Sequence, residues 1–266
     1  MSVLLNTTLS PRPWGVDALP APFVTPPDER IGEVWFTPPA QLDSLLVKYI
    51  FTSEKLSVQV HPSDAQAPAG HRGKEECWLV LAAEPGATLA IGFDAPLGPE
   101  AMRAAALNGS IEQLLSWYPV KSGDFFYIPA GTVHAIGPGL SLIEIQQNSD
   151  ITFRLFDYGR PRELHLDAGI KVAQGAPHDP ANRQHVPDRG EVRLVDGPHF
   201  RLDRIDRAPG ATTAARYQGP LLVLPLDIPL EVDGERVEPG QCALAEEFGQ
   251  IQFAGRSLIT QPCSAG

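Results

Sequence analysis

Prolines and glycines divide this chain into short segments along its whole length. The sequence of 266 residues holds 27 prolines and 24 glycines, and the apolar runs between them are brief. Proline removes a backbone donor and glycine permits the backbone angles of tight turns, so this spacing favours many short strands over long helices. A chain of this length can bury one large core or two modest ones. We therefore expect a mostly β protein with a few short helices.

The expected elements fall into two parts. Residues 1–174 contain most of the strand-like runs, together with two short helices expected at 99–107 and 110–116. Residues 175–190 are charged, dotted with proline and nearly free of large apolar side chains, so we interpret them as a linker. Residues 191–266 return to strand-like runs. This division predicts two β modules joined by an extended connection.

A segment of the first module has a weak copy in the second. Residues 120–129, Val-Lys-Ser-Gly-Asp-Phe-Phe-Tyr-Ile-Pro, align with residues 237–246, Val-Glu-Pro-Gly-Gln-Cys-Ala-Leu-Ala-Glu. The second copy lacks a histidine at the offset where the first has His134. A pattern this short also recurs by chance. If the segments are related, only the first module keeps the histidine and the site that goes with it.

Charge and cysteine usage narrow the class of partner. The formal net charge of −11 opposes nucleic acid or an anionic membrane surface as the main partner, since both require a dense positive footprint. The three cysteines share no paired or metal-type spacing, which predicts reduced thiols. No segment has the pattern of a signal peptide or the length of a membrane span. We expect a soluble cytoplasmic protein, monomeric or homodimeric.

Four polar residues in the first module have the spacing of a metal site. Gln59 and His61 are two residues apart in a run rich in β-branched side chains, so on a strand both project from the same face. Glu76 follows fifteen residues after His61. His134 ends a segment whose proline and glycine force a tight turn, which we expect to aim its side chain back at the pair.

The four ligand types restrict the metal. Two imidazoles, a carboxylate and an amide oxygen suit zinc, and they also suit iron, manganese or cobalt. Sulfur is absent from the set, so a site with room for water or substrate is favoured over a structural zinc site. Taken singly, Gln59 would be an ordinary strand residue, His61 a hydrogen-bonded histidine and Glu76 a solvated charge. The spacing of the four residues taken together favours a metal site over these separate interpretations.

The same residues carry a resemblance to a known family. Residues 123–134, Gly-x5-Pro-x-Gly-x2-His, resemble the second cupin motif. Residues 58–62 (Val-Gln-Val-His-Pro), 73–78 (Gly-Lys-Glu-Glu-Cys-Trp) and 147–154 are similar to the type I mannose-6-phosphate isomerases, in their short bacterial form. The resemblance covers about sixty per cent of the chain, from residue 13 to residue 170. Beyond residue 190 the chain is too diverged to align.

The resemblance implies a double jelly-roll, that is, two cupin-like β modules with one zinc ion per chain in the first and a degenerate second module. It also implies interconversion of mannose 6-phosphate and fructose 6-phosphate through an enediol intermediate, with a phosphorylated hexose as the partner. The family's zinc ligands correspond to Gln59, His61, Glu76 and His134.

Further residues follow from the resemblance and from side-chain chemistry. The family's active-site arginine, lysine and acidic residue correspond to Arg154, Lys74 and Glu144. We predict Arg154 and Lys74 as substrate ligands as well as catalytic residues, because guanidinium and ammonium groups bind phosphate. Arg160 is a second phosphate candidate, although for it and Arg162 a solvated loop position is equally compatible with the sequence. Glu144 can carry the proton, or it can form a structural pair with an arginine.

Two other functions fit a metal-binding cupin. One is an iron dioxygenase, which is disfavoured because a fourth protein ligand at Gln59 crowds the open positions that oxygen needs. The other is a regulatory cupin that binds a sugar without turning it over. The presence of Lys74, Glu144 and Arg154 favours the enzyme over the regulatory cupin.

Overall fold

The computed structural model describes residues 3–263, and within them the strands form four antiparallel sheets. The largest is a seven-stranded sheet with the order β1-β2-β3-β10-β5-β8-β12. Its strands are β1 (Thr7–Val16), β2 (Ile31–Phe36), β3 (Leu45–Thr52), β5 (Glu76–Ala83), β8 (Asp124–Ile128), β10 (Leu140–Gln147) and β12 (Arg183–His185). Every residue of β3 is buried, as expected for a strand that is covered on both faces.

A five-stranded sheet packs against one face of the first. Its order is β11-β4-β9-β6-β7. The strands are β4 (Val58–Val60), β6 (Thr88–Phe93), β7 (Leu115–Pro119), β9 (His134–Ile136) and β11 (Phe153–Phe156). Buried side chains from both sheets meet between them, among them Ile50 and Trp78 from the large sheet and Leu89 and Ile136 from the small one. The two sheets therefore form a β sandwich, the cupin-like fold that the sequence predicts.

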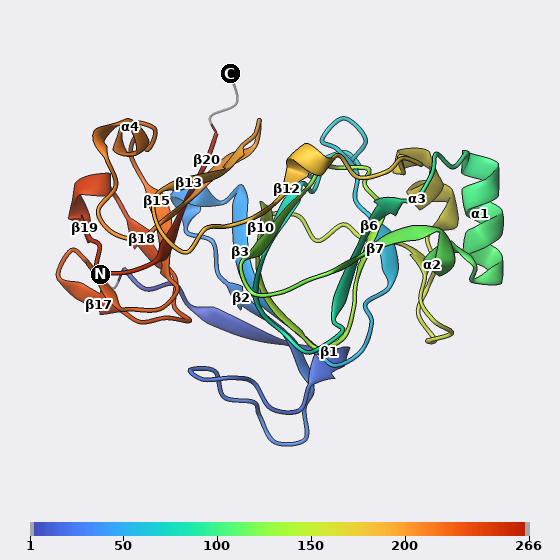
Figure 1. Cartoon of the computed structure of the whole chain (residues 1–266), viewed down its shortest axis with the longest axis horizontal. Helices are drawn as coiled ribbons and strands as arrows, with labels where there is room; N and C mark the ends of the chain where they lie inside the picture. The colour runs from blue at the N-terminus through green and yellow to red at the C-terminus, as the bar shows by residue number, and fades with distance from the viewer. Residues whose placement is uncertain (1–2, 264–266) are drawn as a thin grey trace.

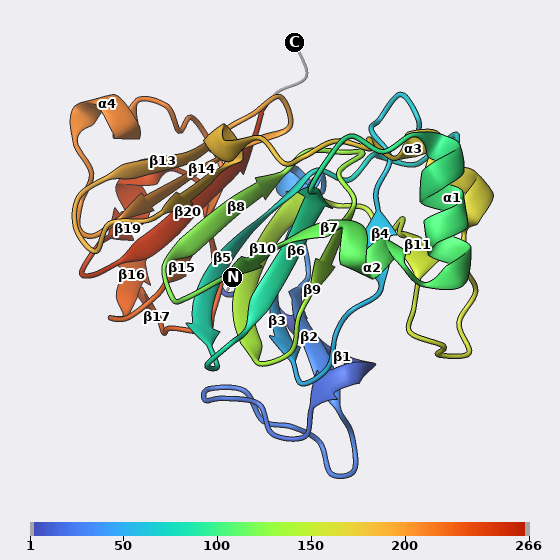
Figure 2. The same ribbon diagram turned by 45° about the vertical axis from the view of Figure 1, so that its right-hand side comes forward.

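Helices cover the outer face of the small sheet. They are α1 (Pro99–Asn108), α2 (Ile111–Leu114) and α3 (Leu166–Val172). Met102 and Ile170 from these helices share a hydrophobic cluster with Val58 and Ala135 of the sheet. Figures 1 and 2 show the three helices together at one end of the molecule. None of the helices within residues 3–263 combines the length and apolarity that crossing a bilayer needs.

The ends of the helices show where local sequence decides structure. Helix α1 begins at Pro99 and is followed by Gly109 in the left-handed region, as proline at the first turn and glycine at the C-cap predict. Helix α2 is shorter than expected, because the chain enters β7 at Leu115 and pairs with β6 from there. Helix α3 was not predicted, since Gly169 inside it lowers the helical signal.

Strands of the C-terminal part form the two remaining sheets. One has the order β13-β14-β20-β15-β18 and the other β17-β16-β19. Their strands are β13 (Val192–Asp196), β14 (Phe200–Ile205), β15 (Leu221–Pro225), β16 (Leu230–Val232), β17 (Glu235–Val237), β18 (Ala243–Ala245), β19 (Ile251–Gln252) and β20 (Ser257–Pro262). The remaining elements are α4 (Ala211–Ala214), η1 (Ala40–Leu42), η2 (Pro180–Asn182) and η3 (Phe248–Gln250). Figure 1 shows these orange and red strands opposite the helical end.

The two parts share a core. Tyr49 and Phe51 of β3 belong to the same buried cluster as Leu202, Leu222 and Leu258 of the C-terminal part. The large sheet is thus covered by apolar side chains on both faces. The expected linker at 175–190 contains η2 and β12, which extends the edge of the large sheet by pairing with β8. The division into domains at 174 and 191 stays a prediction.

A polar cluster also joins the two parts. His199, in the turn between β13 and β14, has its Nδ1 atom 3.2 Å from Gln147 Nε2 and 3.5 Å from Asp64. Its Nε2 atom lies 3.7 Å from Glu75, whose carboxylate also accepts a hydrogen bond from the Tyr127 hydroxyl. The Glu75 side chain is only 15% exposed, and His199 of the C-terminal part is one of the residues beside it.

Candidate metal centre and active-site cavity

Three predicted ligands converge at one edge of the sandwich. His61 directly follows β4, Glu76 begins β5 and His134 begins β9. Strands β4 and β9 pair with Gln59 opposite His134, which brings the second histidine to the first. One donor atom from each of His61, Glu76 and His134 lies within 4.8 Å of the others. The three side chains are buried, so the sandwich fixes their positions.

The two imidazoles present their Nε2 atoms to the centre. Nδ1 of His61 lies 2.8 Å from the carbonyl of Ile151, and Nδ1 of His134 lies 2.9 Å from the carbonyl of Thr132. A carbonyl only accepts, so each Nδ1 donates a hydrogen and each Nε2 keeps its lone pair. Those Nε2 atoms lie 3.4 and 3.3 Å from the Glu76 carboxylate. Metal-binding histidines are held in this way.

Electrostatics keep these groups in the protonation states that a metal requires. Burial lowers the pKa of His61 and of His134, and the Lys74 ammonium contributes in the same direction, so both imidazoles are neutral. Burial would raise the pKa of Glu76, but nearby positive charge, foremost the Lys74 ammonium, outweighs it and holds the pKa well below its ordinary value. The centre therefore offers two neutral nitrogens and one carboxylate.

Glu76 has oxygens to spare for a cation. Both of its carboxylate oxygens are buried, and neither accepts a hydrogen bond within the described part of the chain. The nearest cation is the Nζ atom of Lys74, 2.9 Å from Oε2 in an ion pair. A buried carboxylate with so few partners is costly unless a cation binds it. These residues fit a metal ion.

Gln59 completes the set through its amide. Its Nε2 atom lies 3.2 Å from His134 Nε2, and its Oε1 atom accepts a hydrogen bond from the Ser57 hydroxyl. A half-turn of the amide exchanges oxygen and nitrogen without moving the side chain. Oε1 then faces the centre and Nε2 faces the hydroxyl. All four predicted ligands are thus together, and their binding of a metal stays a prediction.

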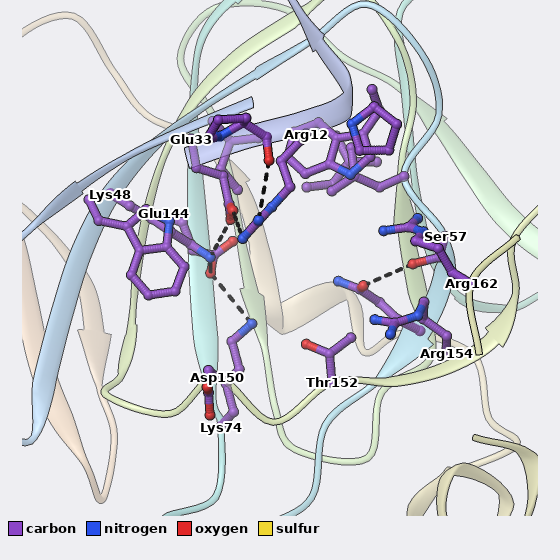
Figure 3. A pocket seen from close by; sticks show the side chains of 18 of the residues that line it. Arg12, Glu33, Lys48, Ser57, Lys74, Glu144, Asp150, Thr152, Arg154 and Arg162 are labelled. Atoms are coloured by element: carbon purple, nitrogen blue, oxygen red, sulfur yellow. Dashed lines mark hydrogen bonds and ion pairs between the residues drawn. The ribbon is translucent and has the colours of Figure 1, made fainter. Parts of the chain in front are cut away.

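A cavity of about 510 Å³ opens beside this centre and includes Gln59 and Lys74 in its lining. Its walls come from β1, β2 and β3 on one side and from β11 and the loop after it on the other. Figure 3 shows the charged groups that project into it. The charged lining residues are Arg12, Glu33, Lys48, Lys74, Glu144, Asp150, Arg154 and Arg162.

Alternating charges connect the cavity wall to the metal centre. Arg12 lies 2.6 Å from Glu33, whose other oxygen is 2.9 Å from Lys48. Lys48 is also 2.9 Å from Glu144, which in turn lies 3.7 Å from Lys74. Burial would raise the pKa of Glu33, but Lys48 and Arg12 outweigh it and lower the pKa to about 2. Each buried charge is therefore flanked by opposite ones.

Glu144 differs from the other carboxylates in proton affinity. Burial and the nearby Glu76 carboxylate raise its pKa above the ordinary value, although Lys48 and Lys74 oppose them. Trp78 donates its indole N–H to Glu144 Oε2 at 3.1 Å. The structural pairing considered for Glu144 was with an arginine, whereas the partner found is Lys48. A buried carboxyl with raised pKa is suited to proton transfer.

The arginines are distributed differently from the prediction. Arg154 on β11 lies opposite Gln59 and lines the cavity, with its Nε donating to the carbonyl of Glu163 at 3.1 Å. The lining does not include Arg160, which pairs with Asp157 and Glu54 instead. The geometry gives no support to Arg160 as a substrate ligand, because those two carboxylates hold it. Arg162 lines the cavity in its place.

Sequence reasoning missed Arg12, Glu33 and Lys48. The available signal was the single lysine in the otherwise apolar strand Leu-Leu-Val-Lys-Tyr-Ile-Phe-Thr at β3. A buried lysine requires a carboxylate partner, and Glu33 on the neighbouring strand is 2.9 Å away. Such a lysine in a strand predicts an internal ion pair even when its partner is unknown.

Comparison with known proteins relates this chain to one group of enzymes. A scan of family models gave no match. The chain is 44% identical over 136 residues to mannose-6-phosphate isomerase of Streptococcus mutans, covering 48% of this chain and 43% of the relative. It is 36% identical over 193 residues to mannose-6-phosphate isomerase ManA of Bacillus subtilis, covering 68% and 60%. The matched region thus spans about half the length of these curated relatives.

Solved structures extend the comparison to the whole fold. The crystal structure of mannose 6-phosphate isomerase from Bacillus subtilis superposes with a TM-score of 0.75 at 22% identity, covering 98% of this chain and 99% of that one. A zinc-bound mannose 6-phosphate isomerase gives a TM-score of 0.70 at 14% identity, covering 97% and 98%. The chain is therefore a homologue of the mannose-6-phosphate isomerases and has the cupin-type β fold of the solved phosphomannose isomerases.

Proposed function

We propose that this protein is a metal-dependent aldose–ketose isomerase that interconverts mannose 6-phosphate and fructose 6-phosphate. The observation that carries the proposal is the buried centre of His61, Glu76 and His134 beside a cavity lined by basic side chains. The names of its curated homologues support the same reaction.

The metal we propose is one zinc ion per chain. His61, Glu76, His134 and Gln59 would hold it through two imidazole nitrogens, a carboxylate and an amide oxygen, a set that suits zinc. The zinc-bound structural neighbour supports that choice over iron, manganese or cobalt. When bound, such an ion supplies Lewis acidity toward the oxygens of the sugar.

The charges of the site fit a phosphorylated sugar. Its basic side chains are Arg12, Lys48, Lys74, Arg154 and Arg162. They are balanced by carboxylates that line the cavity or contact those cations, namely Glu33, Glu76, Glu144, Asp150 and Asp157. A divalent cation at the centre would leave about two positive charges, and a phosphate monoester brings about two negative ones. This chain is acidic overall, so the local balance is specific to the cavity.

The residues of the cavity can perform the proton transfer. Moving a carbonyl between C1 and C2 requires removal of a proton beside the carbonyl and its return to the neighbouring carbon. We assign the proton to Glu144, whose carboxyl is buried beside Lys48 and Trp78. Lys74 lies between Glu76 and Glu144 and can donate to the oxygens of the enediol intermediate. Arg154 offers a planar set of donors to the same oxygens or to the phosphate.

The two other cupin functions are less well supported. A dioxygenase needs open metal positions, and the amide of Gln59, 3.2 Å from His134, would take one of them as a fourth protein ligand. A regulatory sugar-binding protein would have no use for a buried carboxyl of raised pKa beside the centre. A cytoplasmic location and a monomeric or homodimeric state are part of the proposal.

One experiment tests the reaction directly. The purified protein is incubated with fructose 6-phosphate in deuterated water, and mannose 6-phosphate and deuterium at C2 are followed by NMR. We expect metal-dependent product that carries the label, and loss of both after treatment with a chelator. Sugar binding without turnover by the zinc-loaded protein would favour the regulatory cupin, and oxygen uptake would favour the dioxygenase.

A further inference from the structure

Three guanidinium groups converge on the active-site cavity from different elements. Arg12 comes from β1, Arg154 from β11 and Arg162 from the loop that follows β11. Figure 3 shows the Arg12 guanidinium directed toward Glu33 on one wall of the pocket, with Arg154 and Arg162 on the opposite side. Burial and the Arg162 guanidinium lower the pKa of Arg154, and Arg12 acts in the same direction. These cations therefore repel one another unless an anion lies among them.

Local sequence fixes the side chain of Arg12 in this direction. Pro11 and Pro13 flank it, and the pairing of β1 with β2 shifts register on both sides of Pro11, so this part of the strand is irregular. Gly32 on β2 lies beneath the stem of Arg12, where an added Cβ would come within 2.7 Å of its Cβ and Cγ atoms. The absence of a side chain at Gly32 thus makes room for Arg12 to lie across the sheet.

Arg12 also keeps donors free for a ligand. One of its terminal nitrogens pairs with Glu33 at 2.6 Å, and the other makes only a long contact of 3.4 Å with the carbonyl of Pro11. Glu33 is also paired with Lys48, so Arg12 is not its only cationic partner. The Arg12 side chain is 35% exposed, and Arg12 is one of the residues that line the cavity. A partly exposed guanidinium that still has free N–H donors binds phosphate oxygens well.

We propose that Arg12 is a specificity-determining residue that binds the phosphate group of the substrate, across the cavity from Arg154. The inference rests on the proposed function and adds to it the residue that distinguishes a phosphorylated sugar from a free one. A purely structural role, in which Arg12 only balances the charge of Glu33, makes different predictions for variants of these two residues.

The test compares Arg12→Met with the wild-type protein, both loaded with zinc. We expect calorimetry with inorganic phosphate to show affinity weaker by about 10- to 100-fold, the cost of one charge-assisted contact. For fructose 6-phosphate, KM is expected to rise more than kcat falls, and Arg12→Lys should recover part of the affinity. The matched control is Arg236→Met, which removes an exposed arginine on the C-terminal part that pairs only locally with Glu238.

A double variant separates the two roles. If Arg12 only neutralises Glu33, then Arg12→Met/Glu33→Gln restores phosphate binding, and the inference is overturned. If Arg12 binds phosphate, the double variant stays as weak as Arg12→Met. Unchanged phosphate affinity in Arg12→Met, with isomerase activity intact, overturns the inference and leaves the proposed function standing. Loss of phosphate binding in Arg12→Met of a protein that isomerises no sugar supports the phosphate site and refutes the proposed reaction.

Discussion

Replacement of Lys48 by methionine tests whether the buried charges support the fold. The Nζ atom of Lys48 lies 2.9 Å from Glu33 and 2.9 Å from Glu144, and all three side chains are at most 7% exposed. At an effective dielectric constant of about 20, each contact corresponds to about 6 kcal/mol of Coulomb attraction. The desolvation of the charges offsets most of this energy, and loss of one partner from a buried ion pair costs about 3–5 kcal/mol. We expect Lys48→Met to lower the free energy of unfolding by that amount.

The measurement is urea unfolding followed by tryptophan fluorescence. Lys121→Met is the matched control, because Lys121 is exposed and makes no ion pair within residues 3–263. Adding Glu144→Gln to Lys48→Met should recover part of the lost stability, since it removes one of the two buried carboxylates that lose their contact with Lys48. A difference between Lys48→Met and Lys121→Met of less than about 1 kcal/mol, the value of an exposed pair, would refute the reasoning.

Three further predictions concern the metal, the pH and the tryptophan. Chelation should lower the midpoint temperature of thermal unfolding, and zinc should restore it. Zinc at a thousand times its Kd adds about 4 kcal/mol to the free energy of unfolding, so an unchanged midpoint would contradict the metal site. The pKa of Glu33 is lowered from 4.5 to about 2, which contributes about 3 kcal/mol to the free energy of unfolding above pH 4.5. This contribution is lost as the pH falls toward 2. The free energy of unfolding of Glu33→Gln should therefore change less with acid pH than that of the wild-type protein. Trp78→Phe removes the hydrogen bond to Glu144 and should lower the free energy of unfolding, measured in urea, by about 1.5–3 kcal/mol. A loss of less than about 0.5 kcal/mol would show that this hydrogen bond is dispensable.

Features that depend on local periodicity were predictable from the sequence. The period of two along a strand places Gln59 and His61 toward the same centre, and the Pro-x-Gly turn returns His134 to it. Pro99 and Gly109 mark the ends of α1. The mostly β fold is confirmed, because the density of turns is itself a local property of the chain.

Features that depend on distant pairing were not predictable. Arg12 reaches the cavity only because β1 pairs with β2, which in turn pairs with β3. The expected linker contributes β12 through pairing with β8, although its composition is that of a loop. Arg160 and Arg162 are two residues apart in one loop and both pair with Asp157, but only Arg160 also pairs with Glu54, on the segment after β3, and only Arg162 lines the cavity.

The contacts of His199 connect the C-terminal part to the segment that carries two of the predicted ligands. Its ring lies near Asp64, in the loop between the proposed ligands His61 and Glu76, and near Glu75, which directly precedes Glu76. The C-terminal part, which supplies none of the four predicted ligands, thus contacts the segment between His61 and Glu76. Loss of these contacts would free that segment, so a chain without its C-terminal part would hold Glu76 less firmly.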